Sequence, residues 1–307
     1  MISSSFPGLE RYLESGVAEV EAALERSVAR FEGGFGAGVD PATRSAVRHG
    51  VLSGGKRLRP VLCIAAYEAC GGTREPGAYD LAAALELIHA FSLMHDDLPC
   101  MDDAELRRGR LTTHRVHGEE ATILGGAALI PMAALQALEA CAGLGCDEAR
   151  ARRVARRLME ASGAGGMVGG QWLDLLGEGR TLTKNELDEL HRRKTGALLA
   201  ASVEIGAIAA GASDDDVEAV IGYGQAIGLA FQIADDVLDA TASAETLGKI
   251  PSDAELDKST YVAQYGLADA RARAREQVDE ALGALDAAGL RSDALEALAR
   301  YVVERGK

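Results

Sequence analysis

Apolar residues recur every three or four positions along most of the chain, which is the spacing of one face of an α-helix. This pattern predicts helices over residues 9–31, 41–50, 59–70, 79–97, 118–142, 147–164, 183–210, 213–240, 259–288 and 292–305. Asp40 followed by Pro41 matches the cap and first-turn proline that begin a helix. Between residues 82 and 94 Glu86 is the only charge, so we expect that helix to be buried on most of its circumference.

Strands are not predicted, because no run of alternating apolar and polar residues is long enough to indicate one. The 307 residues are 48% hydrophobic but only 4% aromatic, with seven prolines, and long stretches rich in Ala, Leu, Glu and Arg favour helix. No linker, low-complexity tract or solenoid repeat divides the chain. The sequence therefore predicts one all-α domain over residues 1–307.

The net charge of −15 limits the possible partners. Binding to nucleic acid depends on neutralising phosphates, so nucleic acid is not expected as a partner, and a basic membrane-docking face is also disfavoured. The first residues lack a basic start before an apolar run, and stretches such as 197–212 are too short or too interrupted to span a bilayer. Five cysteines without CxxC spacing indicate reduced thiols. We expect a cytoplasmic protein without stable membrane insertion.

Two acidic clusters each follow an apolar helical stretch: HDDLPCMDD over 95–103 and FQIADDVLD over 231–239. On a helix, Asp235 and Asp239 share one face with Cβ atoms about 5–6 Å apart, so their charges repel unless a cation lies between them. One acidic pair alone would favour a solvated cap or turn. Two pairs, both after apolar helices, favour a metal site, because unpaired carboxylates are costly there.

The type of metal follows from the ligands. Pro99 is expected to end the first helix and let Asp102 turn back toward Asp96. Oxygen ligands without a Cys/His set indicate magnesium instead of zinc, and magnesium completes its shell with water and phosphate oxygens. An EF-hand calcium loop is the rival interpretation, but neither cluster has its alternating acidic spacing and closing glutamate. The sequence therefore predicts a magnesium site that binds a diphosphate.

Basic residues accompany both clusters. GGKRLRP over 54–60 places three cations after a glycine pair, and others follow at Arg107, Arg108, Lys194, Lys249 and Lys258. Residues 50–56 superficially fit a phosphate-binding P-loop, but the next position is Arg57 instead of Ser or Thr, and no strand precedes them. Each cation alone would be interpreted as a solvated surface charge. Around two acidic metal sites they fit a second diphosphate pocket that needs no metal.

Taken together, six motifs resemble the trans-prenyl diphosphate synthase (polyprenyl synthetase) family: GGKRLRP, DDLPCMD followed by LRRG, GGQWLDL, RRKTG, FQIADDVLD and LGK…DKSTY. The resemblance covers residues 50–261 in the family's order. It is strongest to the bacterial farnesyl/geranylgeranyl group, marked by Pro99 and Cys100 inside the first motif. It implies a large helical bundle of the isoprenoid synthase type with a central cavity, a magnesium cofactor and a homodimer.

The resemblance also implies roles for individual residues. Those that hold magnesium on the allylic diphosphate are Asp96, Asp102 and Asp235, while those that act through bound water or behind these ligands are Asp97, Asp236 and Asp239. The residues that bind the allylic diphosphate are Arg107, Lys194, Lys249 and Lys258. Those that bind isopentenyl diphosphate are Lys56, Arg59, His89 and Arg108. Thr195 and Gln232 line the reacting end, with oxygens toward a developing carbocation.

Several positions depart from the family's pattern. Leu111 occupies a position where the family usually has proline, Ala127 one where it commonly has aspartate, and Ala104-Glu105 one where it has an acidic pair. In addition, the 249–253 loop is one residue shorter than in the family, and Asp257 replaces a glycine. The last two differences concern the loop that carries Lys249 and Lys258. The magnesium ligands and the GGKRLRP pocket are intact.

These roles imply a magnesium-dependent prenyltransferase. The allylic diphosphate ionises, the double bond of isopentenyl diphosphate attacks the cation, and the proton goes to the departing diphosphate, since no dedicated base is evident. The apolar stretch over 85–94 would exclude water. A terpene cyclase would not need the GGKRLRP pocket and typically has more aromatics than 4%, and a non-catalytic regulatory subunit is expected to lose one acidic cluster.

Product length is the remaining expectation. Helix geometry places Ser92 and His89 on the face of Asp96 and Phe91 on the flank, so geometry alone does not select Phe91. In the group that the chain resembles, an aromatic residue five positions before the first aspartate is associated with stopping at fifteen carbons. Phe91 holds that position beside the small Ser92, so farnesyl diphosphate is expected, with geranylgeranyl diphosphate as the alternative. Phe91 would otherwise only pack against a neighbouring helix.

Overall fold

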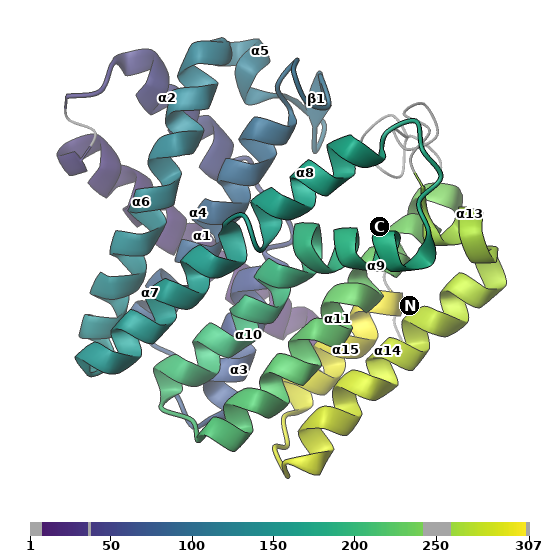
Figure 1. Ribbon diagram of the computed structural model, residues 1–307. Coiled ribbons are helices and arrows are strands. Elements are labelled where there is room, and N and C mark those ends of the chain that lie inside the picture. Colours follow the sequence, from purple (N-terminus) through teal and green to yellow (C-terminus); the bar gives the residue numbers. More distant parts are fainter. Residues whose placement is uncertain (1–7, 36–37, 242–258, 305–307) are drawn as a thin grey trace.

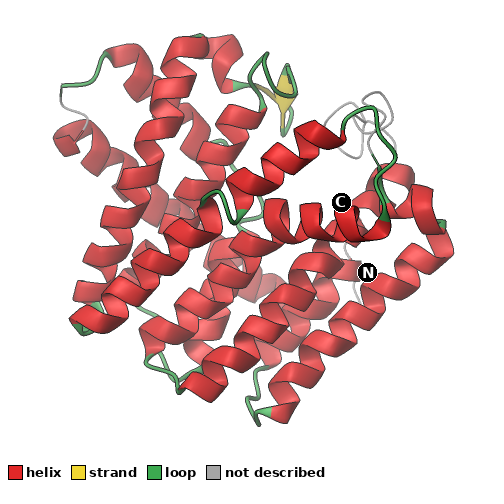
Figure 2. Cartoon of the chain, in the orientation of Figure 1, coloured by secondary structure: helices red, strands yellow, loops and turns green. Residues whose placement is uncertain are grey.

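The structure is a computed structural model that describes residues 8–35, 38–241 and 259–304, and most of these are helical (Figures 1 and 2). The elements are α1 (Leu9–Arg30), η1 (Phe31–Phe35), α2 (Pro41–Val51), α3 (Leu58–Ala69), α4 (Pro76–Asp96), α5 (Thr113–His117), α6 (Glu119–Gly143), α7 (Glu148–Ser162), α8 (Met167–Gly177), α9 (Lys184–His191), η2 (Arg192–Gly196), α10 (Ala197–Ala210), α11 (Asp214–Thr241), α13 (Tyr261–Tyr265), α14 (Leu267–Ala287) and α15 (Asp293–Glu304). The all-α prediction is confirmed. In the described ranges, strand is confined to the short antiparallel pair β1 (Leu106–Arg107) and β2 (Arg110–Leu111).

Two helices form the centre of the bundle. Helix α4 packs mainly on α6 and also on α1 and α3, while α10 lies between α3, α11 and α7 (Figure 1). Leu85, Leu87 and Ile88 on α4 are fully buried, and so is nearly every residue of α10. A helix that is apolar on all sides belongs in a core. The expectation that residues 82–94 are buried is therefore confirmed, and this helix delivers its last residue, Asp96, to the acidic loop.

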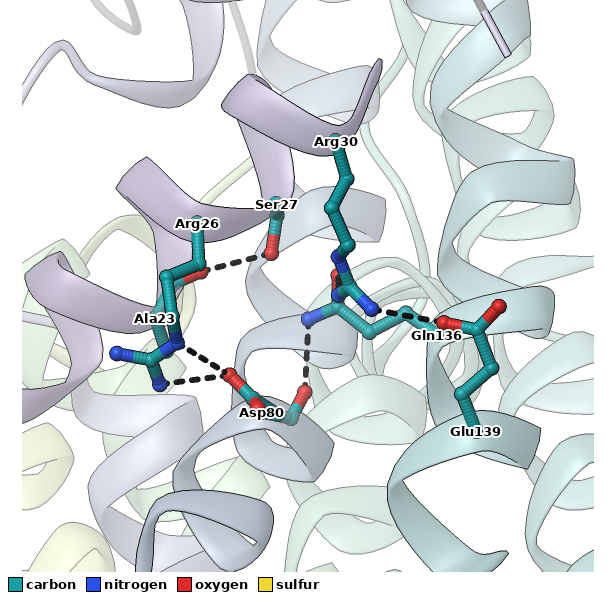
Figure 3. A network of polar contacts seen from close by, with 7 residues as sticks. All are labelled: Ala23, Arg26, Ser27, Arg30, Asp80, Gln136 and Glu139. Atoms are coloured by element: carbon teal, nitrogen blue, oxygen red, sulfur yellow. Dashed lines mark hydrogen bonds and ion pairs between the residues drawn. The ribbon is translucent and has the colours of Figure 1, made fainter. Parts of the chain in front are cut away.

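Polar contacts fix α1 across the outside of this core (Figure 3). Arg26 donates to Asp80 Oδ1 on α4 over 2.7 Å, and Arg30 donates to Gln136 Oε1 and Glu139 Oε2 on α6 over 3.0 and 2.7 Å. The Gln136 amide in turn donates to the Asp80 carbonyl over 2.7 Å. Each contact is partly exposed, so together they set the register of α1, α4 and α6 more than they stabilise the fold.

Two predicted helices are interrupted in the structure, and two helices were not predicted. The helix predicted over 183–210 contains the π-turn η2, which separates α9 from α10. The helix predicted over 259–288 is two helices, because Gly266 takes a φ of 78° between α13 and α14. Helices α5 and α8 were not predicted, because α5 spans only five residues and α8 contains a glycine pair.

By length and composition alone, α6 and α11 could cross a membrane. Within the most apolar window of each, 50% and 56% of the residues are buried inside the protein. Core helices of soluble proteins pass the same test, so length and composition alone do not assign α6 or α11 to a membrane.

Candidate active site

The first acidic cluster forms a tight loop at the end of α4. Helix α4 ends at Asp96, and the chain turns back so that the Asp102 amide donates to the Asp96 carbonyl over 2.9 Å. Two further amides of the loop, from Ala104 and Asp103, donate to the carbonyls of Asp97 and Leu98. As the sequence predicted, the turn that contains Pro99 brings Asp102 to Asp96.

The carboxyl of Asp96 has a raised pKa. This pKa is raised to about 6, chiefly by burial and also by the neighbouring Asp102 and Asp97, against the opposing effect of Lys194 and Arg107. Desolvation and like charges both disfavour the ionised form. An additional cation at this carboxylate would therefore relieve an unfavourable charge, which is the property expected of a metal ligand at a functional site.

Arg107 is bound to the buried Asp97. Its Nε and Nη2 lie 2.7 and 2.5 Å from Asp97 Oδ1, and burial still raises the pKa of the Asp97 carboxyl despite this partner. Asp96 and Asp102 also lie within electrostatic reach of the Arg107 guanidinium. Arg107 was expected to bind diphosphate oxygens, and in the structure it is tethered beside the acidic loop where such oxygens would arrive.

The π-turn η2 contributes Lys194 and Thr195. Lys194 Nζ lies 2.5 Å from Asp174 Oδ2 on α8 and within electrostatic reach of Asp96. Helix α8 approaches closely because Gly170 has no side chain: a Cβ there would lie 2.1 Å from the Lys194 amide nitrogen. The GGQWLDL motif thus serves two purposes, close packing by its glycine and pairing by Asp174. The motif was recognisable in the sequence, but no role was predicted for Asp174.

The second acidic cluster lies at the C-terminal end of α11 and joins η2 through hydrogen bonds. The Thr195 hydroxyl donates to Gln232 Oε1 over 3.0 Å, and Gln232 Nε2 donates to Asp236 Oδ1 over 3.1 Å. Asp235 lies within electrostatic reach of Arg59 from α3. Because Lys194 adjoins Asp96 while Thr195 adjoins Gln232, η2 connects the two acidic clusters.

A cavity of about 110 Å³ opens at this junction. Its lining is mostly polar and comes from α8, α9, η2, α11 and the start of α13: Asp174, Gly177, Leu182, Leu190, His191, Lys194, Gln232, Asp236, Ser259 and Thr260. His191 was not a candidate from the sequence, and neither were Ser259 and Thr260, which directly precede α13. His191 directly precedes the RRKTG motif, and Ser259 and Thr260 lie within DKSTY, so these motifs could have indicated them as site residues.

A second group of basic side chains lies around His89 on α4. His89 on α4 has its pKa lowered well below the usual value, first by burial and then by Arg59, Arg108 and Arg107. The buried Nε of Arg59 has no hydrogen-bond partner among the described residues. Arg108 reaches the Gly54 carbonyl, so the β1–β2 turn touches the loop before Lys56. A buried guanidinium nitrogen without an acceptor, close to Arg108, fits an anion.

Arg57 does not belong to this group, which corrects the expectation of three available cations in GGKRLRP. Its side chain is 1% exposed and bonds Glu21 over 2.8 Å, Glu86 over 2.6 Å and the Val51 carbonyl over 3.0 Å. Glu86 is 3% exposed, so the lone charge noted in the apolar helix is the buried partner of Arg57. Pairing buried charges avoids a large desolvation cost.

The acidic residues fit magnesium. No three described His, Cys, Asp or Glu side chains come together as a complete protein cage. Magnesium does not require one, since it is usually held by one or two carboxylates and takes its other ligands from water and phosphate. Asp96 and Asp102 on the loop, with Asp235 on α11, are hard oxygen donors of this kind.

The remaining predicted residues divide into two sets. Phe91 is 7% exposed and meets the His95 ring edge-on at 4.7 Å, while His95 contacts the Ile123 carbonyl on α6, so Phe91 lies on the α6 side of α4. The Ser92 hydroxyl donates to the His89 carbonyl over 2.9 Å. Lys249 and Lys258 lie outside the described residues.

Comparison with known proteins matches this arrangement to one family. The sequence profile described as Polyprenyl synthetase matches residues 40–298. A farnesyl diphosphate synthase of Escherichia coli is 45% identical over 267 residues, which cover 85% of this chain and 88% of that protein. The mitochondrial geranylgeranyl pyrophosphate synthase 6 of Arabidopsis thaliana is 44% identical over 270 residues, which cover 85% and 79% of the two chains.

Solved structures are similar as well. A crystal structure described as an FPP/GFPP synthase from Zymomonas mobilis superposes with a TM-score of 0.80 at 32% identity. The superposition covers 96% of this chain and 99% of the other. The expected bundle of the isoprenoid synthase type is thereby confirmed.

Proposed function

This chain belongs to the polyprenyl synthetase family, and from that premise we propose that it condenses isopentenyl diphosphate with dimethylallyl and geranyl diphosphates to give farnesyl diphosphate. The observation that carries the two-substrate reaction is the group of Arg59, Arg108 and His89, in which the buried Nε of Arg59 has no hydrogen-bond partner among the described residues. A terpene cyclase, which ionises one diphosphate, has no use for it. A regulatory subunit would not need both acidic clusters.

The residues divide the chemistry between them. Asp96, Asp102 and Asp235 would hold magnesium, which when bound supplies positive charge to the allylic diphosphate oxygens. Lys194 and Arg107, tethered by Asp174 and Asp97, hold further positive charge at the same place. Such fixed charges stabilise a transition state because they need no reorientation as the bond breaks.

The second substrate is held by Arg59 and its neighbours. The Arg59 guanidinium can give isopentenyl diphosphate charge-assisted hydrogen bonds without a metal. The buried apolar face of α4 keeps water from the allylic cation. We propose that the protein acts in the cytoplasm and without membrane insertion.

Replacing Arg59 or Lys56 with alanine should raise the KM for isopentenyl diphosphate about tenfold to a hundredfold, equivalent to about 1.4–2.7 kcal/mol, while kcat changes little. The reason is that both residues bind the non-reacting diphosphate equally in the ground and transition states. Steady-state kinetics with each substrate varied in turn measures the split. A matching rise in the KM for the allylic diphosphate would contradict the assignment of this pocket.

For product length we propose Phe91 as the floor of the chain pocket. Its burial on the α6 side of α4, about a turn and a half before Asp96, supports this role. Phe91→Ala should shift the main product from fifteen carbons to twenty or more, as measured by mass spectrometry, with allylic ionisation largely intact.

The matched control is Phe31→Ala, which opens a comparable cavity at the end of α1, where Phe31 is 3% exposed. Both variants should lose about 3–5 kcal/mol of stability, so a change in product restricted to Phe91→Ala separates pocket shape from stability. A folded, active Phe91→Ala enzyme with the wild-type product would remove Phe91 as the floor.

We also propose a homodimer formed through α6. Residues 121–138 of this helix contain no charged residue, although the chain carries a net charge of −15. Large side chains along the helix remain 38–58% exposed: Ile123, Leu124, Leu135 and Leu138. Two copies can meet on such a face without like-charge repulsion, and burial of its apolar area stabilises the contact.

Leu135→Glu should convert the dimer into a monomer, because it places a charge in the apolar contact. Light scattering after size-exclusion chromatography measures the mass, and Arg156→Glu on α7, whose side chain is 80% exposed, is the control. A wild-type protein that is monomeric at micromolar concentration would contradict the proposal.

A further inference from the structure

A continuous chain of hydrogen bonds runs from the site into the protein interior. It begins at Thr195 on η2, passes through Gln232 and Asp236 on α11, and ends at the backbone amide of Tyr261 on α13. The three contacts measure 3.0, 3.1 and 2.8 Å. Three elements that are distant in the sequence are thus joined through polar groups, two of which, Gln232 and Asp236, line the cavity beside Lys194.

The direction of every bond in this chain follows from Asp236. A backbone N–H can only donate, so Asp236 Oδ2 accepts from Tyr261. A carboxylate offers only acceptors, so Gln232 must turn its NH2 group toward Oδ1. The other end of the same amide is then a carbonyl oxygen, which has no hydrogen to give. The Thr195 hydroxyl must therefore be the donor to Gln232.

Burial prevents this direction from reversing. Asp236 is 4% exposed and Tyr261 is fully buried, with its ring stacked on His191 at 5.4 Å and its hydroxyl bound to Asp188. A rotated Gln232 amide would place its oxygen against the Asp236 carboxylate. It would also take the Gln232 N–H away from the buried Asp236 carboxylate, which costs the free energy of that hydrogen bond.

The consequence for Thr195 concerns its lone pairs. Its single hydroxyl hydrogen is committed to Gln232, so both lone pairs of Oγ1 point elsewhere. We propose that Asp236 is a positioning residue that sets the hydrogen-bond direction of Gln232 and Thr195, so that lone pairs of Thr195, and not its hydrogen, face the carbon where positive charge develops. This inference rests on the proposed function, because it presupposes an allylic cation beside Thr195.

The resemblance to the family implied a different role for Asp236, through water on the magnesium site. The structure occupies one of its oxygens with Gln232 and the other with the Tyr261 amide. The two roles predict different measurements. A role through the metal changes the magnesium requirement, whereas a role through Thr195 changes kcat alone and disappears when the hydroxyl is absent.

The test begins with Asp236→Asn, which preserves size. The new side chain must keep its oxygen on the Tyr261 amide, so its NH2 faces Gln232, the Gln232 amide turns over, and the Thr195 hydrogen is released toward the cavity. We expect kcat to fall on the order of 100-fold, the size of effect seen when one fixed dipole at a developing charge is lost. The KM for isopentenyl diphosphate and the magnesium concentration at half-activity should not change.

A second substitution restores the direction. In Asp236→Asn combined with Gln232→Glu, the new carboxylate accepts from both the asparagine NH2 and the Thr195 hydroxyl. We expect kcat to recover to within about tenfold of wild type, whereas Gln232→Glu alone sets two carboxylates face to face and should be less active than the double variant. If Asp236→Asn alone does not fold, the comparison of these two variants decides, and a double variant no better than Gln232→Glu overturns the proposal.

Thr195→Val closes the cycle, since valine keeps the shape of threonine without the hydroxyl. In this background Asp236→Asn should lower kcat by less than about threefold, because residues that act through one group are not additive. An equal fall in both backgrounds, or a shifted magnesium requirement, would overturn the inference. A wild-type protein that forms no prenyl product would instead overturn the proposed function, so the two failures are distinguishable.

Discussion

Replacing Asp96 or Asp235 with alanine should lower kcat roughly a thousandfold or more, equivalent to about 4 kcal/mol of lost transition-state stabilisation. Both carboxylates would hold magnesium, whose positive charge would offset the negative charge that develops on the diphosphate as its bond to carbon breaks. The raised pKa of Asp96, about 6, indicates that its ionised form is disfavoured without a bound cation. Initial rates at saturating substrate measure the loss.

Asp103→Asn is the matched control for these variants. Asp103 lies on the same loop, but its side chain is 60% exposed and its contact with Arg115 is 3.7 Å long. Asparagine also tolerates the φ of 44° at this position. We expect nearly wild-type kcat. Aspartate variants that changed only KM would mean that Asp96 and Asp235 bind substrate without assisting ionisation.

Arg57→Met should lower the free energy of unfolding by about 3–5 kcal/mol, because it leaves the Glu86 carboxylate buried without its partner. The pair lies at 2.6 Å, with side chains 1% and 3% exposed, and joins the start of α3 to the middle of α4. Urea denaturation followed by circular dichroism measures the change in midpoint.

Two further variants define the origin of that loss. Arg57→Met combined with Glu86→Leu removes both charges and should recover most of the stability. Arg152→Met breaks a pair whose side chains are 74% and 79% exposed and should cost less than about 1 kcal/mol. An Arg57→Met protein as stable as wild type would show that Glu86 is compensated in another way.

The positions of the helices were largely predictable, because burial of one face leaves a periodic pattern in the sequence. The interruptions were less so. The π-turn η2 preserves apolar spacing on both sides, so 183–210 looked like one helix, although the turn carries Lys194 and Thr195. The break at Gly266 was concealed in the same way by the apolar residues around it.

In the site, the residue types were predictable and their partners were not. Arg57, Arg59 and Lys56 are equivalent cations in the sequence, yet Arg57 is buried against Glu21 and Glu86 while Arg59 leaves a nitrogen for an anion. Pairing depends on which helices meet, and that information is non-local. The role of Asp174 was not predicted for the same reason, since its partner Lys194 lies 20 residues away on another element.

The most direct test of the two-substrate reaction is release of diphosphate from a mixture of isopentenyl and dimethylallyl diphosphates in the presence of magnesium. The protein should release diphosphate only when both substrates are present, form fifteen-carbon product, and stop when a chelator removes the metal. The coupling is required because the cation formed from one substrate is captured by the other. Equal release from dimethylallyl diphosphate alone would contradict condensation and favour a cyclase, and full turnover without metal would contradict the role of the aspartates.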